Sequence, residues 1–171
     1  CGIQTLALSQ TNFGCQHVGQ NPVVLTVTDV NGNTATCAAS VEVQDLVAPV
    51  ALCHNITVQL GTNGTASITT TDINNGSNDA CGIANRSLDN TTFSCANVNG
   101  NTVTLTVTDV NGNSSTCTAT VLVQDLIAPT AICQNLTVQL DVQGLGSITP
   151  VMVNNGSSDN CAVASLSLNN S

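Results

Sequence analysis

The sequence predicts an all-β protein made of tandem immunoglobulin-like β-sandwich repeats. Three observations support this: the chain repeats every 80 positions without insertion or deletion, apolar and polar residues alternate with period two, and turn signals separate the alternating stretches. The string LTVTDVNGN at residues 25–33 returns at residues 105–113. A fixed long period is typical of proteins that copy one unit along a line, so extension, display or adhesion is expected before catalysis.

The period divides the 171 residues into one complete repeat and parts of two others. We expect residues 1–46 to be the C-terminal part of a repeat, residues 47–126 to be a complete immunoglobulin-like repeat, and residues 127–171 to be the N-terminal part of the next. These are called the first, central and third repeats below. The chain is interpreted as a window on a longer protein.

Composition narrows the classes of function. Ten acidic residues stand against one basic residue, which gives a net charge of −9. Nucleic acids and anionic membranes are bound through Lys and Arg, so neither is an expected partner and no direct membrane insertion is expected in this segment. Each full repeat has one Phe and the chain has no Trp or Tyr, so the core must be thin. Small domains of this kind usually depend on disulfides, which favours oxidised cysteines and an extracellular location.

The first half of the central repeat predicts three strands, at residues 55–60 (NITVQL), 65–71 (TASITTT) and 83–89 (IANRSLD). Turn-forming residues separate them, at 62–64 (TNG) and 74–77 (NNGS). No segment reads as a helix.

The second half predicts a β-hairpin. Apolar residues alternate with threonine and other residues over 102–108 and again over 118–124. Between these strands lies Asn111-Gly112, a dipeptide that favours a type I′ turn. Several short strands with turns inside 80 residues point to an antiparallel sandwich of immunoglobulin type.

Short linkers that contain proline join successive repeats, at residues 45–49 and 125–129. They limit bending between neighbours. At roughly 3.3 Å per residue, strands of eight to ten residues would make each sandwich on the order of 30–40 Å long, so stiffly linked sandwiches predict a stalk.

The cysteine pairing is predicted from the strand order, and spacing alone leaves alternatives open. The first strand of an immunoglobulin-like sandwich often runs parallel beside the last, which favours Cys53 with Cys117. Short loops favour Cys81 with Cys95 and, by the period, Cys1 with Cys15. The cysteines that then need partners outside the sequence are Cys37, Cys133 and Cys161. A rival scheme joins Cys117 to Cys133 and Cys37 to Cys53 across the linkers.

Calcium is the candidate metal, because tandem β-sandwiches can bind it where carboxylates gather near a linker. The candidates are Asp125, which begins a linker, and Asp79 and Asp159, which precede cysteines. The alternative is that each aspartate caps a turn through its own side chain. No other cofactor is expected. No catalytic arrangement is recognisable either, since His17 and His54 are not repeated and no base stands near a nucleophile.

Seven features of the repeat carry a family resemblance: Cys53, NITVQL, SITTTDINNGSNDACGI, FSC, NTVTLTVTDVNGN, STCTATV and VQDLIAP. Together they resemble the HYR-type, immunoglobulin-like repeats of giant cell-surface adhesins in Bacteroidota. Such repeats occur in the gliding-motility adhesin and its relatives. The resemblance covers the whole chain. It implies export by the type nine secretion route, an anchor elsewhere in the parent protein, and contact with surfaces through an unidentified ligand or glycan, with neighbouring repeats of the same chain as partners.

The expected function is therefore a structural and adhesive stalk in a secreted bacterial surface protein. Two alternatives remain open: the subunit of an extracellular filament that shares strands between chains, and the accessory binding module of a secreted enzyme. The mass of the native polypeptide distinguishes the three.

Overall fold

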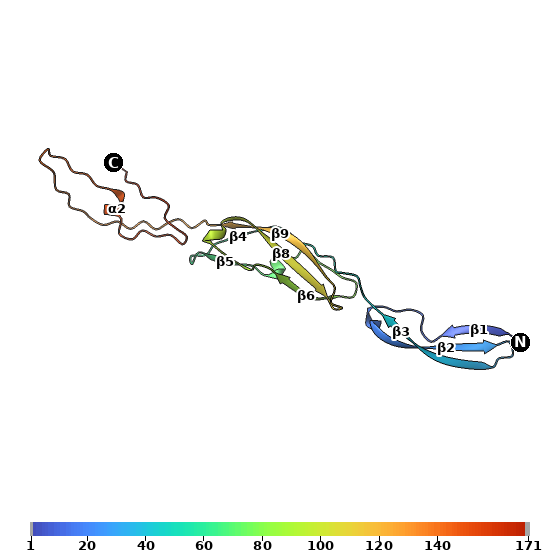
Figure 1. Cartoon of the computed structure of the whole chain (residues 1–171). Coiled ribbons are helices and arrows are strands. Elements are labelled where there is room, and N and C mark those ends of the chain that lie inside the picture. The colour runs from blue at the N-terminus through green and yellow to red at the C-terminus, as the bar shows by residue number, and fades with distance from the viewer. Residues whose placement is uncertain (1, 170–171) are drawn as a thin grey trace. The chain divides into compact units, whose positions relative to one another are not determined.

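The computed structural model describes residues 2–169 and consists of strands joined by turns (Figure 1). The all-β prediction is confirmed. The strands are β1 (Ile3–Leu8), β2 (Gly19–Asp29), β3 (Thr34–Val43), β4 (Ile56–Gln59), β5 (Thr65–Ser67), β6 (Ile83–Leu88), β7 (Thr92–Ser94), β8 (Asn99–Asp109) and β9 (Ser114–Gln124). The helical turns are η1 (Cys15–His17), α1 (Thr70–Ile73), η2 (Cys95–Asn97) and α2 (Pro150–Val153).

The elements recur with the period of the sequence. Strands β1, β2 and β3 begin 80 positions before β6, β8 and β9, and the turns η1 and α1 lie 80 positions before η2 and α2. The first and central repeats therefore share these elements, whereas the segments of the third repeat that match β4, β5 and β6 form no strands among the described residues.

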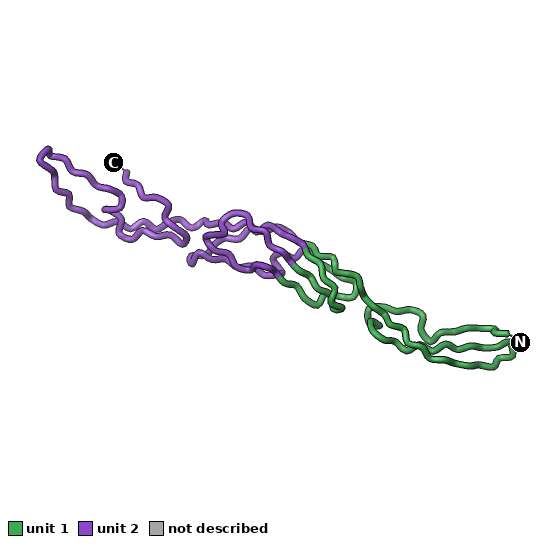
Figure 2. The backbone as a smooth tube through the Cα atoms, in the orientation of Figure 1, with its two compact units in different colours: residues 1–52, 76–87, 106–116 green, residues 53–75, 88–105, 117–171 purple. Residues whose placement is uncertain are grey.

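The chain forms two compact units, which Figure 2 distinguishes by colour. Unit 1 contains residues 1–52, 76–87 and 106–116, and unit 2 contains residues 53–75, 88–105 and 117–171. Each unit holds one of the two linkers between repeats. The repeat boundaries at 46/47 and 126/127 stay a prediction.

Hydrogen bonding arranges the strands into three sheets. In the first repeat, β2 lies between β1 and β3 and pairs antiparallel with both. In the central repeat the order is β4-β9-β8-β6, and β5 pairs antiparallel with β7 as a second layer. Strand β4 runs parallel to β9, with Ile56 opposite Val121 and Gln59 opposite Gln124. This is the predicted first-to-last pairing of an immunoglobulin-like sandwich.

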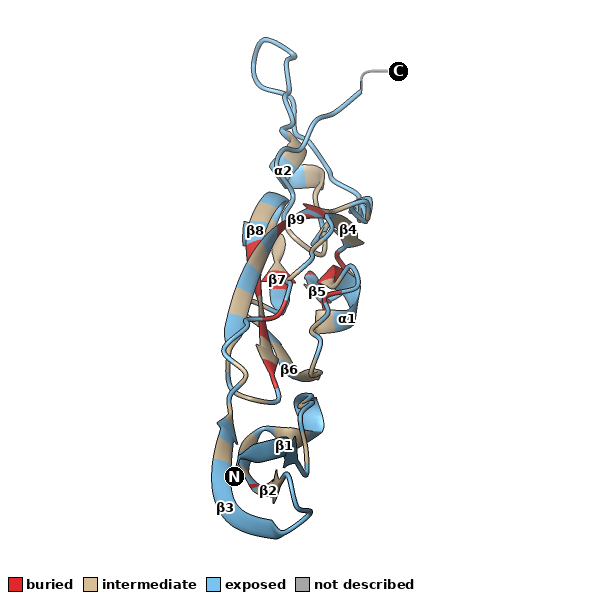
Figure 3. Ribbon diagram, turned by 90° about the vertical axis from the view of Figure 1, so that its right-hand side faces the viewer, coloured by how far each residue is buried: buried red, intermediate tan, exposed pale blue. Residues whose placement is uncertain are grey.

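The core follows the predicted alternation. Every second side chain is buried over the second halves of β8 and β9, while the residues between them are intermediate or exposed (Figure 3). The buried apolar residues of these strands are Val103, Leu105, Val107, Ala119, Val121 and Val123. Leu60, which follows β4 at the edge of the same sheet, is also buried, and the opposite side of the core contributes Ile68, Ile73 and Phe93. A few aliphatic side chains and one ring thus make up the apolar core of the central repeat.

The hairpin between β8 and β9 forms, but its turn differs from the prediction. Gly112 has a φ of 93°, whereas Asn111 is absent from the positive-φ residues, so the two positive φ angles of a type I′ turn are not met. The amide of Asp109 donates to the carbonyl of Asn113 at 3.0 Å, which closes a three-residue loop. The Asp109 carboxylate fixes this loop by accepting the amides of Asn111 (2.9 Å) and Asn113 (2.8 Å).

A helical turn replaces part of the strand predicted at 65–71. Strand β5 stops at Ser67, and α1 begins at Thr70. The reason is a capping box: the Asp72 carboxylate accepts the backbone amide of Thr69 at 2.7 Å, which favours a helix start over a continued strand. None of the helices in the described residues is long and apolar enough to span a membrane.

Replacing the single aromatic side chain of the central repeat should be costly. Phe93 is 2% exposed, so Phe93→Ala should lower the free energy of unfolding by about 3–5 kcal/mol through lost burial and a cavity. Phe13 occupies the same repeat position but is only partly buried, so Phe13→Ala is the matched control with a smaller loss. Denaturant unfolding followed by circular dichroism measures both, and equal losses would contradict the assigned core.

Acid should loosen the hairpin loop through Asp109. Burial acts to raise the pKa of this carboxyl, but hydrogen bonds from Asn113 and Asn111 outweigh it and hold the pKa below its ordinary value. A depressed folded pKa stabilises the fold above the unfolded pKa of about 3.9, and this contribution is lost as the pH falls toward the folded pKa. Asp109→Asn should therefore flatten the decline in stability below about pH 4. Thermal unfolding across pH 2–7 checks this, and an unchanged slope would argue against it.

Candidate functional site

The candidate site is the junction between one repeat and the next, where a disulfide lies close to the linker. The first junction is defined here as the linker 45–49 with the Cys15–Cys81 disulfide, and the second as the linker 125–129 with the Cys95–Cys161 disulfide. Each junction lies within one compact unit. In both, a cysteine in a 3-10 turn of one repeat is bonded to a cysteine just before β6, or its equivalent position, in the following repeat.

At the first junction, the bonded cysteines have a Cα–Cα distance of 5.1 Å and are 66 positions apart. Asp79 supports this bond: its Oδ1 accepts the amides of Cys81 at 2.7 Å and Gly82 at 3.1 Å. The linker is fixed by a contact of its own: Asp45 Oδ1 accepts the amide of Val47 at 3.1 Å. The hairpin loop also contacts it, since Asn113 Nδ2 donates to the Asp45 carbonyl at 3.1 Å.

The second junction repeats this arrangement. Cys95 and Cys161 have a Cα–Cα distance of 5.3 Å and the same 66-position separation. Asp159 Oδ2 accepts the amide of Cys161 at 2.9 Å, and Asp125 Oδ1 accepts the amide of Ile127 at 3.2 Å.

Asn160 is an addition at this junction, because the equivalent position in the first junction is an alanine. Its Nδ2 donates to Asp125 Oδ1 at 3.1 Å and to the carbonyl of Gly61 at 3.3 Å. The amide therefore ties the third repeat both to the linker and to a turn of the central repeat.

Gly64 makes the close approach at the second junction possible. Its φ of +72° lies in the left-handed region, and a Cβ placed on it would be 2.7 Å from the Asn160 carbonyl oxygen and 3.0 Å from Cys95 Sγ. Backbone of the third repeat therefore packs directly against this turn, which only glycine permits.

The third disulfide lies inside the central repeat and is the one expected from the strand order. Cys53 and Cys117 are bonded with a Cα–Cα distance of 5.8 Å. Cys117 lies in β9 and Cys53 lies three positions before β4, so the bond joins β9 to the segment that leads into its parallel partner. It excludes the rival pairing of these two cysteines across the linkers.

The other predicted pairs are wrong. Cys81 is bonded to Cys15 rather than Cys95, and Cys161 is bonded to Cys95 rather than to a cysteine outside the sequence. The predicted Cys1–Cys15 bond is excluded by the partner of Cys15, and Cys1 itself lies outside the described residues. The physical reason is the strand order: β7 pairs with β5 and not with β6, so the chain does not return beside β6. The six extended residues of β6 span roughly 20 Å, whereas a disulfide needs Cα atoms within about 7 Å.

Cys37 and Cys133 are exposed and unbonded in the structure. They occupy the repeat positions of Cys117 and Cys53, which are bonded to each other. The expectation that their partners lie in further repeats stays a prediction.

The calcium candidates gather at the junctions but make a sparse donor set. Asp45, Asp79 and the sulfur of Cys81 lie within 4.8 Å of one another, and Asp125 and Asp159 occupy the same repeat positions at the second junction. The sulfur is consumed by a disulfide, and one oxygen of each aspartate already accepts backbone amides. Calcium takes about six to eight oxygens, so this set fits it poorly and no metal is assigned.

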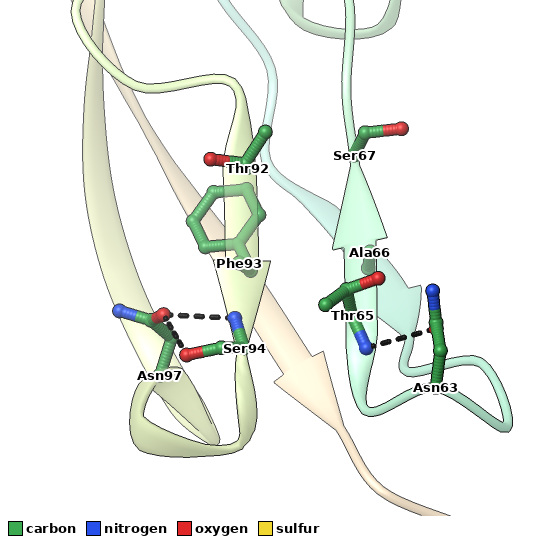
Figure 4. Close-up of a pocket in the computed structure, with 8 residues that line it drawn as sticks. All are labelled: Asn63, Thr65, Ala66, Ser67, Thr92, Phe93, Ser94 and Asn97. Carbon is green, nitrogen blue, oxygen red and sulfur yellow. Dashed lines mark hydrogen bonds between the residues drawn. The ribbon is translucent and has the colours of Figure 1, made fainter.

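A shallow pocket lies between β5 and β7 (Figure 4). Hydroxyl and amide groups line it around Phe93. Two of the side chains are held by the backbone: Asn63 Oδ1 accepts the backbone amide of Thr65 at 3.2 Å, and Asn97 Oδ1 accepts that of Ser94 at 2.9 Å. No ionisable side chain is among the residues that line it, so the pocket offers no group for acid–base chemistry.

Comparison with known proteins does not assign a family. No protein-family model matches the chain, and no curated protein matches it. Among solved structures, the protocadherin gammaB7 EC3-6 cis-dimer structure is similar, with a TM-score of 0.39 and 16% sequence identity. The match covers 84% of this chain and 46% of that one, so the chain spans about half the length of the structure it resembles.

Gly64→Ala should impair the second junction selectively. The added methyl would clash with the Asn160 carbonyl and Cys95 Sγ, so refolding in a glutathione buffer should yield severalfold less of the Cys95–Cys161 bond. Gly144→Ala is the matched control, because Gly144 has a φ of +74° at the same repeat position and no neighbour within 4 Å of its Cβ. Mass spectrometry of non-reduced peptides measures the bond. Equal losses in the two variants would show that backbone strain, and not the close approach, is responsible.

Proposed function

We propose that this chain is part of a structural and adhesive stalk in a large secreted bacterial cell-surface adhesin. The observation that carries the proposal is the disulfide across each junction between repeats, present twice with the same 66-position separation. A bond that joins successive repeats serves a protein whose task is to keep them together outside the cell. Such bonds are typical of oxidising compartments.

The rest of the molecule supports the same role. The side chains that gather at the junctions serve turns and linkers, and the pocket between β5 and β7 has no ionisable lining residue. The chain carries one basic residue, so it lacks the charge that nucleic acids and anionic membranes require. We therefore propose a non-enzymatic function whose partners are neighbouring repeats and a surface ligand or glycan reached by the whole adhesin.

The motif resemblance refines the proposal to HYR-type repeats of Bacteroidota adhesins, exported to the cell surface and related to gliding motility. In such an array the period gives Cys37 and Cys133 partners in further repeats, each 64 positions away as Cys53 and Cys117 are. All cysteines of the array would then be oxidised.

The test is the native polypeptide of the source cells. Antibodies raised against residues 1–171 should label intact cells, and the labelled band should have the mass of a chain of many such repeats, on the order of thousands of residues. Fab fragments of the same antibodies should reduce attachment of cells to a surface, with Fab fragments against another surface protein as the control. A native chain near 17 kDa would favour a filament subunit, and a chain with an attached catalytic domain would favour an enzyme accessory module. Either result would overturn the proposal.

A further inference from the structure

The disulfides determine which part of the backbone bears a pulling force. Cys15 is bonded to Cys81, and Cys95 is bonded to Cys161. The backbone between these two bonds runs only from Cys81 to Cys95, which are 14 positions apart. All other backbone between Cys15 and Cys161 lies in loops that the two bonds close.

We propose that the segment Cys81–Cys95 is a covalent strut that makes the repeat array nearly inextensible. At about 3.6 Å per residue, the taut path from Cys15 to Cys161 through both bonds is about 60 Å long. The same 146 positions extend to about 530 Å when the bonds are reduced. Unfolding the rest of the central repeat therefore cannot lengthen the oxidised chain.

The strut contains β6 and β7 and is held to the sandwich near its start and at its middle. The carbonyl of Gly82 accepts the amide of Val110 at 3.1 Å. Further along, the amide of Asp89 donates to the carbonyl of Thr104 at 3.2 Å, and Asp89 Oδ1 accepts the amide of Thr104 at 2.9 Å. A force that enters through the disulfides must break these bonds before the strut straightens, and the strut then stops further extension.

The linkers and the core strands are shielded from the load. The linkers 45–49 and 125–129 and the strands β8 and β9 all lie within the closed loops. The Cys53–Cys117 bond offers no shorter route: a path from Cys15 through it to Cys161 crosses 82 positions of backbone. This bond stabilises the central repeat but does not set the length of the taut chain.

The strut extends the proposed function, and it rests on that function only for its role in adhesion. A stalk that anchors a cell to a surface has to transmit force, and a short covalent path transmits it without lengthening. The bond connectivity is tested on the chain itself, whereas the adhesive role is tested on cells, so failure of one leaves the other measurable.

Single-molecule stretching tests the strut, with handles at the two chain ends and a force that breaks all noncovalent structure. A background of Cys1→Ser, Cys37→Ser and Cys133→Ser leaves the six bonded cysteines. The contour between Cys15 and Cys161 should be about 60 Å in the oxidised protein, and added reductant should release about 470 Å more. An oxidised contour near 300 Å, the length of the route through Cys53–Cys117, would overturn the proposal.

Two double variants separate the strut from general stabilisation. Cys95→Ala with Cys161→Ala lengthens the shortest path to 72 positions, so the contour should grow by about 200 Å. Cys53→Ala with Cys117→Ala is the matched control and should leave the contour unchanged, even if the protein unfolds at a lower force. If the control lengthens the chain, or the first variant does not, the strut is refuted. Peptide mapping before stretching checks the pairing, and a Cys81–Cys95 bond would also refute it.

Discussion

The disulfide between successive repeats is the constraint on which the rest of the structure depends. The apolar core is thin: except for Val23, its buried side chains all belong to the central repeat, which has a few aliphatic residues and one ring. Closing a loop of 66 positions stabilises the folded state by about 4 kcal/mol in the chain-entropy account. Fully burying one large aliphatic side chain gives about 1.5–3 kcal/mol. One bond therefore contributes more than any single aliphatic residue of the core, and it does so at the junction, where the contacts described between repeats are a few hydrogen bonds.

The acidic residues also stabilise the fold where the core is small, because their carboxylates hold turns and linkers in place. Those of the hairpins and junctions act on the backbone: Asp109 closes a hairpin loop, Asp79 and Asp159 accept amides beside bonded cysteines, and Asp125 fixes the start of a linker. A carboxylate that accepts two amides holds a turn without help from a core. The negative charge of the chain is thus in part a by-product of turn chemistry, which explains acidic positions that recur with the period without requiring a ligand.

Much of the fold could be predicted from the sequence, because the same local patterns of alternation and turn residues occur in two repeats. Alternation identified the buried faces of β8 and β9, and the immunoglobulin-like order predicted that β4 would run beside β9 and bring Cys53 to Cys117. The α1 turn was missed because its threonines have high strand propensity, and the deciding contact is the side chain of Asp72. The junction disulfides were missed for another reason. Under a strict period, Cys15 is compatible with Cys1 and with Cys81. The decision between a local bond and one that reaches the next repeat depends on the strand order, in which β6 is extended and β7 does not pair with it.

The long separation of the bonded cysteines has a consequence for how the protein matures. Closing 14 positions between Cys81 and Cys95 costs about 1.4 kcal/mol less loop entropy than closing the 66 between Cys95 and Cys161, so the wrong bond forms roughly ten times more readily in an unfolded chain. The partner of Cys95 also lies in the following repeat, so the native bond cannot form before that repeat has been synthesised. A short-range mispair of this kind reaches the native bond by thiol–disulfide exchange, in which a thiolate attacks the mispaired disulfide.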